Sequence, residues 1–226
     1  MELKGRASTQ GAKTLGRRVL QWLNLRPEES ARTFLMFAFY TATSIGILFL
    51  EVSVAALFLG EYGADKLPLV YMVSALIGTV LGFFYSLLQK FLPLRRVIVI
   101  IAVLMGLPLL LFRFGLGLPL MAAYTVFLMR LWLEAIYVLN ELNTSITANQ
   151  IFNIREIKRA YPLISSGVLM ADVLSGVSLP FLRAEFGLNN IILFACFMLM
   201  LGAGILLYLS QAYQQFFPDS PKRLLQ

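Results

Sequence analysis

Long apolar runs dominate the chain after Thr33, and short polar connections separate them. A helix needs about 20 mostly apolar residues to cross the hydrocarbon core of a bilayer. The runs predict six spans, at residues 34–60, 67–88, 97–112, 118–142, 161–182 and 189–210. They are continuous, without the alternation of outer-membrane strands, so a β-barrel is excluded. We therefore expect an all-α membrane protein, a bundle of six transmembrane helices.

Two of the spans carry local signals of their own. The third is the shortest and contains Pro108, which predicts a kink because proline cannot donate the helical hydrogen bond. The fourth continues as a polar helix to about Ile151.

Residues 1–33 are polar and basic, and they precede the predicted membrane domain (34–210) and a C-terminal tail (211–226). Pro27, followed by two acids, predicts a helix start. Residues 19–25 are apolar between arginines. They either lie in the headgroup layer, with Trp22 at the interface, or belong to a disordered tail. No apolar core with a cleavage site follows the early charges, so the segment does not read as a signal peptide.

The composition excludes several classes of protein. Of 226 residues, 59% are hydrophobic and 14% are charged, whereas soluble domains have about 45–50% apolar and about 25% charged residues. Ordinary soluble, disordered and nucleic-acid-binding proteins are therefore excluded. The chain has no His and only one Cys, Cys196. We expect no enzyme activity, no metal site and no cofactor, because imidazole ligands, thiolate clusters and disulfides are all missing.

Basic residues fall mainly on one side of the predicted spans. Seven precede the first span, three lie in each of the second-to-third and fourth-to-fifth connections, and two follow the sixth span. The opposite side has three, Lys66, Arg113 and Arg183. Cytoplasmic loops are enriched in Lys and Arg, so both termini are expected in the cytoplasm, and the net charge of +7 needs no nucleic acid to explain it. A bacterial inner membrane is favoured, with a thylakoid or plastid membrane as the alternative.

Five ionisable residues lie at membrane depth, where each costs roughly 2.5–3.5 kcal/mol on insertion scales and needs a partner or an aqueous cavity. They are Glu51, Arg130, Glu134, Glu141 and Asp172. In the fourth span, Arg130, Glu134, Tyr137 and Glu141 share one helical face. Arg130 and Glu134 are one turn apart and can neutralise each other. Two interpretations remain: a charge pair that joins helices, or the lining of a polar cavity, which the polar residues Asn140, Asn143, Thr144 and Thr147 would extend toward the cytoplasm.

Other spans carry related patterns. Tyr40, Ser44 and Glu51 share a face of the first span, where Glu51 is either an interfacial acid or part of the path. Asp172 lies near mid-membrane on a stripe with Ser165, Ser175 and Gly176, and is the better cavity or gating candidate. The second span has a small-residue stripe, Ser74, Gly78, Gly82 and Ser86, which favours close helix packing, although a moving contact would use the same residues.

The basic connection before the fifth span supplies candidate anion contacts, Arg155, Lys158 and Arg159. Arg and Lys suit phosphate. The alternative is the ordinary excess of positive charge in cytoplasmic loops. No Walker A loop, dinucleotide-binding glycine pattern or nucleophile elbow is present.

Six spans with polar first, fourth and fifth helices resemble one half of a major facilitator superfamily transporter. Residues 132–182 are similar to the ATP/ADP translocase family, through Trp132-Leu133-Glu134, Asn149-Gln150-Ile151-Phe152 and the run from Ile154 to Leu163. Within that run Lys158-Arg159 match the Lys-Arg of the family's Glu-x-x-Lys-Arg-x-Tyr/Phe-Pro-Leu stretch. Gly167 and Gly176 stand in the helix that follows, which is Gly-rich in the family. Glu156 is one position off the usual spacing. The superfamily's second-to-third loop motif keeps Gly82 and Arg95-Arg96, but Leu87-Leu88-Gln89 stands where an Asp is usual.

The resemblance implies a fold in which the first and fourth helices line a cavity, the second and fifth meet the other half, and the third and sixth face lipid. It implies transport of an anionic nucleotide-like solute, with Arg130, Lys158 and Arg159 on phosphates and Glu134, Glu141 and Asp172 shaping the path. Alternating access needs two repeats around the substrate, so the expected partner is a second copy or a missing half. The competing hypothesis is a non-transporting subunit of a larger membrane complex.

Overall fold

The computed structural model describes residues 26–217, and the apolar stretch at residues 19–25 lies outside them. The described residues contain helices and no β-strand. Six helical segments are long and apolar enough to cross a membrane. The chain is therefore an integral, multi-pass α-helical membrane protein.

The helices follow one another with short connections. They are α2 (Pro27–Tyr62), η1 (Ala64–Lys66), α3 (Leu67–Phe91), α4 (Leu94–Gly106), α5 (Pro108–Gly115), α6 (Ala122–Ile151), α7 (Ile154–Phe186), α8 (Leu188–Ala212) and η2 (Gln214–Phe216). The third crossing is interrupted at Leu107, directly before Pro108, in agreement with the expected kink. The fourth helix begins at Ala122 rather than at residue 118, because turns around Gly117 and Pro119 occupy the preceding residues.

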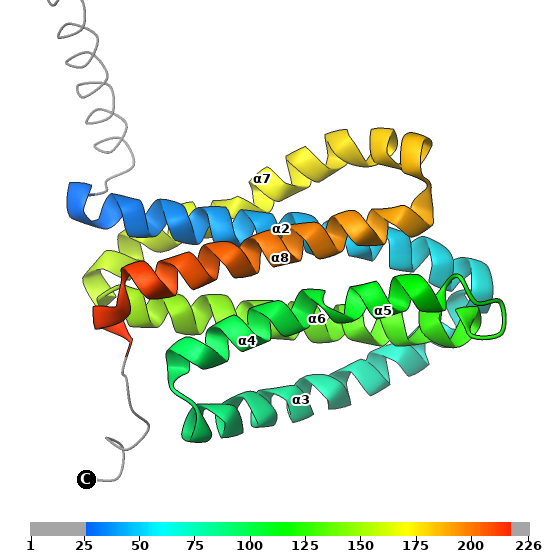
Figure 1. The fold of residues 1–226 in the computed structure, drawn as a ribbon, viewed down its shortest axis with the longest axis horizontal. Coiled ribbons are helices and arrows are strands. Elements are labelled where there is room, and N and C mark those ends of the chain that lie inside the picture. The colour runs from blue at the N-terminus through cyan, green and yellow to red at the C-terminus, as the bar shows by residue number, and fades with distance from the viewer. Residues whose placement is uncertain (1–25, 218–226) are drawn as a thin grey trace, which may run out of the picture.

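Both ends of the described chain lie at one end of the bundle, together with the α3–α4 and α6–α7 connections (Figure 1). We call this the basic end. It carries Arg26, Arg32, Lys90, Arg95, Arg96, Arg155, Lys158 and Arg159. The opposite end, where α2 joins α3, carries Lys66, Arg113 and Arg183.

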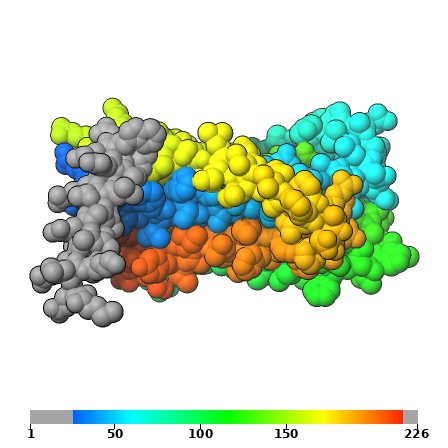
Figure 2. Space-filling model, turned by 90° about the horizontal axis from the view of Figure 1, so that it is seen from above, coloured from blue at the N-terminus to red at the C-terminus, as the bar shows by residue number. Residues whose placement is uncertain are grey.

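Helix α2 is the centre of the bundle. It packs against α6, α7 and α8 and is the most buried of the six spans. Helices α3 and α7 lie on the two outer edges and are the most exposed (Figure 1). Figure 2 shows α7 on the surface, with part of α2 visible between it and α8.

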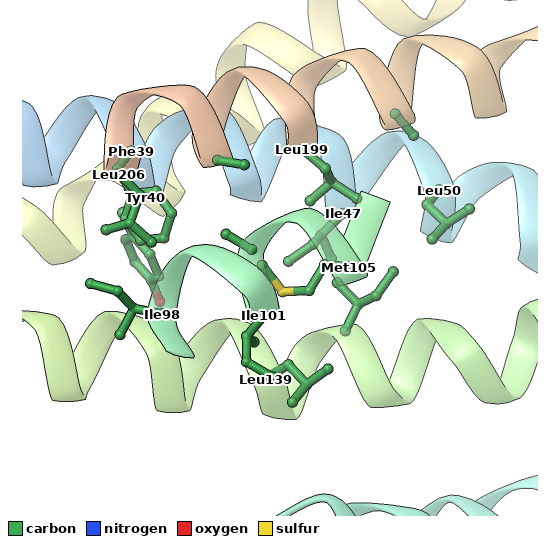
Figure 3. Close-up of a cluster of buried hydrophobic side chains, with 14 of the residues drawn as sticks. Phe39, Tyr40, Ile47, Leu50, Ile98, Ile101, Met105, Leu139, Leu199 and Leu206 are labelled. Carbon is green, nitrogen blue, oxygen red and sulfur yellow. The ribbon is translucent and has the colours of Figure 1, made fainter. Parts of the chain in front are cut away.

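The apolar core forms where α2, α4, α6 and α8 meet (Figure 3). Ile47 and Leu50 of α2 and Leu199 of α8 are almost completely buried there, together with Met105 of α4 and Leu139 of α6. A smaller cluster of Phe58, Val70 and Val126 joins α2, α3 and α6 toward the opposite end.

Glycines let the neighbouring helices approach α2 closely. A methyl group added at Gly202 of α8 would lie 2.5 Å from Thr43 Cγ2, and one added at Gly46 would lie 2.9 Å from Leu199 Cγ. On the other side of α2, a methyl group at Gly167 of α7 would lie 2.8 Å from the Thr41 hydroxyl oxygen. Small residues at such contacts allow close packing in lipid, where no hydrophobic force draws helices together.

The helix packing contains an internal repeat. Helix α2 packs against α7 and α8, and correspondingly α6 packs against α3 and α4. Exchanging the first three spans with the last three maps the main packed pairs of spans onto one another. Three crossings are an odd number, so the second triplet runs through the membrane in the opposite direction to the first. This order of contacts is the one expected of an inverted repeat, an arrangement that is common in transporters.

The α2–α8 contact yields a prediction on stability. Gly202→Ala should destabilise the protein by about 1–3 kcal/mol, the usual range for overpacking, because the stiff Thr43 side chain is held by a bond to the Phe39 carbonyl. Gly204→Ala on the same helix is the control, since no atom lies within 4 Å of its added methyl group. Cys196 is buried, so its reaction with a thiol dye during heating reports unfolding. Equal melting temperatures for the two variants would contradict the proposed contact.

Candidate functional site

Two tyrosine–carboxylate pairs connect α2 and α6 at membrane depth. The Tyr40 hydroxyl of α2 donates to Glu141 Oε1 of α6 at 2.5 Å. The Tyr137 hydroxyl of α6 donates to Glu51 Oε2 of α2 at 2.7 Å. Each helix thus supplies one donor and one carboxylate. The pairs give each carboxylate a hydrogen bond that hydrocarbon cannot offer.

Arg130 and Glu134, one turn apart on α6, form an ion pair. Arg130 Nη1 lies 2.5 Å from Glu134 Oε1, and the two side chains are 11% and 28% exposed. The Arg130 guanidinium also lies over the Tyr71 ring of α3, 5.5 Å from its centroid. Arg130 is the only cation on the α6 face that it shares with Glu134, Tyr137 and Glu141. It is therefore held by a carboxylate and an aromatic ring.

These groups line a cavity of about 210 Å³ between α2, α3 and α6. Its polar lining consists of Glu51, Tyr71, Arg130, Glu134 and Tyr137. Phe58, Leu59, Leu67 and Leu133 supply much of the apolar wall. The structure thus brings together four of the sequence-predicted polar residues, while Glu141 lies outside the cavity with Tyr40. Two carboxylates and one guanidinium give the lining a formal charge of −1.

Asp172 of α7 does not join this cavity. It is exposed, between the exposed apolar side chains Met170 and Val173, and forms no ion pair or side-chain hydrogen bond with the described residues. Ser165 bonds to the carbonyl of Pro162 in its own helix, and an added methyl at Gly176 would meet nothing within 4 Å. Ser165, Asp172 and Gly176 therefore face away from the bundle, whereas Ser175 of the same stripe is buried in it.

The predicted anion contacts lie at the basic end, and one of the three is already paired. Arg159 Nη2 is 2.7 Å from Glu29 Oε1 of α2. Arg155 and Lys158 are exposed. A cleft of about 490 Å³ there has Arg26, Glu29 and Arg155 in its lining.

A second salt bridge at this end, between Arg32 and Glu156, is not predicted by the sequence. Arg32 Nη2 lies 3.3 Å from Glu156 Oε1, and Nη1 donates to the Ile151 carbonyl at 2.7 Å. Its guanidinium lies 5.4 Å from the Phe152 ring centroid and 5.0 Å from that of Phe216. In the sequence Arg32 stands out only as one basic residue among seven before the first span. Its partners are more than a hundred residues away, so no local signal identifies them.

The uncharged polar residues around and beyond Glu141 on α6 are buried inside the bundle. Asn143 accepts a hydrogen bond from the Tyr85 hydroxyl of α3 at 3.0 Å and donates to the Ile98 carbonyl of α4 at 2.9 Å. Asn140, Thr144 and Thr147 are also buried. Asn143 thus joins α6 to α3 and α4, and none of the four residues lines the cavity between α2, α3 and α6.

The small-residue stripe of α3 divides into two parts. Ser74 is buried, and a methyl group at Gly78 would lie 3.4 Å from Val138 Cγ2 of α6, so this part faces the chain's own bundle. A methyl group at Gly82 would meet nothing within 4 Å, and Ser86 is exposed. The second part is therefore the one available to another helix.

No family of protein sequences, no curated protein and no solved structure matches this chain. Nor do the residues that the structure describes contain three His, Cys, Asp or Glu side chains placed to hold a metal ion.

The Arg130–Glu134 pair gives a prediction on folding. Arg130→Ala should lower the yield of folded protein more than Arg130→Ala combined with Glu134→Ala, because the single change leaves a carboxylate without its cation at membrane depth. The yield is measured as the monodisperse fraction after extraction in mild detergent. A double variant much worse than the single one would mean that the two residues do not neutralise each other.

Proposed function

We propose that the chain is one six-helix half of a facilitator-type transporter, and that its α2–α6 face lines the transport path once a second six-helix unit docks against it. The observation that carries this proposal is the polar cavity between α2, α3 and α6, where Glu51, Arg130, Glu134 and Tyr137 gather. Ionisable groups at membrane depth are costly and usually mark a path for ions or substrates.

The packing of the helices supports the same proposal. Its two triplets repeat each other's contacts, and three-helix inverted repeats build each half of a major facilitator transporter. The central position of α2 and the exposed edges formed by α3 and α7 also agree with the resemblance in sequence. Fold alone does not define function, so the polar groups that the fold brings together are the main support for transport.

A second unit is part of the proposal because alternating access requires two repeats that move around a shared site. Large apolar side chains such as Met72, Phe83, Leu169 and Phe181 project from α3 and α7. Asp172 projects from α7 as well and needs a polar partner there. A second copy of this chain or a separate half supplies these contacts.

The resemblance suggests an anionic, nucleotide-like solute, and the charges of the structure restrict where such a solute can bind. Glu51, Glu134, Glu141 and Asp172 outnumber Arg130 at membrane depth, and Arg130 is already paired. We therefore place the first phosphate contacts at the basic end, on the exposed Arg155 and Lys158.

A non-transporting subunit is the second candidate. The Tyr40–Glu141, Tyr137–Glu51 and Arg130–Glu134 contacts are all made within the chain. Polar groups that satisfy one another can hold a bundle together without any solute. In that case the α2–α6 face would be covered by a partner and would carry no water.

Uptake of labelled ADP into proteoliposomes tests the proposal on the assembly purified in mild detergent. Tyr137→Phe removes only the hydroxyl that holds Glu51, and should lower saturable uptake about tenfold, the effect of losing one hydrogen bond to a charged group. Tyr124→Phe is the control on the same helix, because this tyrosine is exposed and away from the cavity.

The native mass of the same assembly separates the two candidates. The transporter proposal predicts two six-helix units per particle and uptake above that of empty liposomes. A particle of this chain with an unrelated, larger membrane protein, and no uptake, would favour the accessory subunit.

A further inference from the structure

A second cleft at the basic end lies away from the α2–α6 cavity, where the start of α4 meets the end of α8. It encloses about 520 Å³. Its lining consists of Pro93, Arg95, Arg96, Val99, Ile100, Leu207 and Ser210. Two guanidinium groups thus stand beside an apolar wall.

Among the described residues, the two arginines have no partner that explains their position. Neither forms an ion pair or a side-chain hydrogen bond with residues 26–217, whereas Arg32 and Arg159 at the same end are both paired with glutamates. They occupy the first turn of α4, which begins at Leu94. The helix dipole is positive there and disfavours cations. An anion in the cleft would relieve both the charge repulsion and the dipole penalty.

The apolar wall indicates which kind of anion fits. Val99 and Ile100 lie one helical turn beyond Arg95 and Arg96, on the same side of α4. Ile100 is 47% exposed, Leu104 one turn further on is 41% exposed, and Leu207 of α8 is 42% exposed. An apolar surface therefore continues from the two charges toward the middle of the membrane. A free inorganic anion would gain nothing from that surface.

We propose that this cleft binds an anionic phospholipid. The phosphate pairs with Arg95 and Arg96, since guanidinium groups bind phosphate oxygens in a bidentate manner. One acyl chain lies along Ile100, Leu104 and Leu207, in the seam between α4 and α8. The site does not depend on the transport proposal, because none of its residues lines the α2–α6 cavity.

The position of Lys90 argues against a purely topological role for the two arginines. An excess of basic residues in a cytoplasmic connection satisfies the positive-inside rule wherever the residues stand in it. Lys90 lies in the same region, is exposed and does not line the cleft. It therefore contributes to topology without contributing to this site.

Binding is tested by native mass spectrometry of the full chain in mild detergent, titrated with dioleoyl phosphatidylglycerol. Arg95→Gln with Arg96→Gln should weaken binding about 30-fold, that is about fivefold for each basic residue near an anionic lipid. Lys90→Gln with Arg183→Gln removes two exposed charges elsewhere and should leave the affinity of the wild type unchanged.

Three results would overturn the proposal. The first is equal affinity for phosphatidylcholine, and the second is unchanged binding by the Arg95 and Arg96 double variant. The third is equal competition by inorganic phosphate or by glycerophosphoglycerol, the headgroup without acyl chains, which would show a free phosphate site. If the charge variants lose their fold, Leu207→Ala tests the apolar wall. This change should weaken binding of dioleoyl phosphatidylglycerol and leave binding of dihexanoyl phosphatidylglycerol unchanged. If the variant bound both lipids with the affinity of the wild type, the result would count against the lipid.

Discussion

The structure depends on how α2 is enclosed. The hydrocarbon of a membrane offers no hydrogen bonds, so every polar group at membrane depth needs a partner from the protein or from an aqueous cavity. Helix α2 meets this need by packing among three neighbours, and Gly202 and Gly167 allow α8 and α7 to approach it closely. Its polar face is thereby turned toward α6, where Tyr40 and Glu51 find their partners. The positions of the remaining helices follow from this arrangement.

The sequence predicts the helices well because each membrane span carries its own signal. Continuous apolar runs locate all six, and Pro108 locates the interruption in the third. The shared face of Arg130, Glu134 and Tyr137 is also predictable, since helical spacing alone places them together. Periodicity identifies a face, but it does not identify the helix that the face meets.

Three placements that the sequence does not predict depend on that missing information. Asn143 is polar like the cavity residues of the same helix, yet it bonds to Tyr85 and Ile98 inside the bundle. Asp172 is a better cavity candidate than Glu51 in the sequence, yet it is exposed on α7, whereas Glu51 lines the cavity. Arg32 meets Glu156 across more than a hundred residues. Each outcome follows from tertiary packing, which one sequence without its structure does not specify.

The central claim is that the α2–α6 face lines a water-filled path. The accessibility of two neighbouring alanine positions to a water-soluble reagent tests this claim most directly. Ala55 lines the cavity, whereas Ala56 is exposed at nearly the same depth but does not line it. Cysteines are introduced at each position in a Cys196→Ala background and treated in native membranes with a charged, membrane-impermeant thiol reagent. The transporter account predicts that the cysteine at position 55 reacts and that the one at position 56 does not. Two unreactive cysteines, or two equally reactive ones, would contradict it.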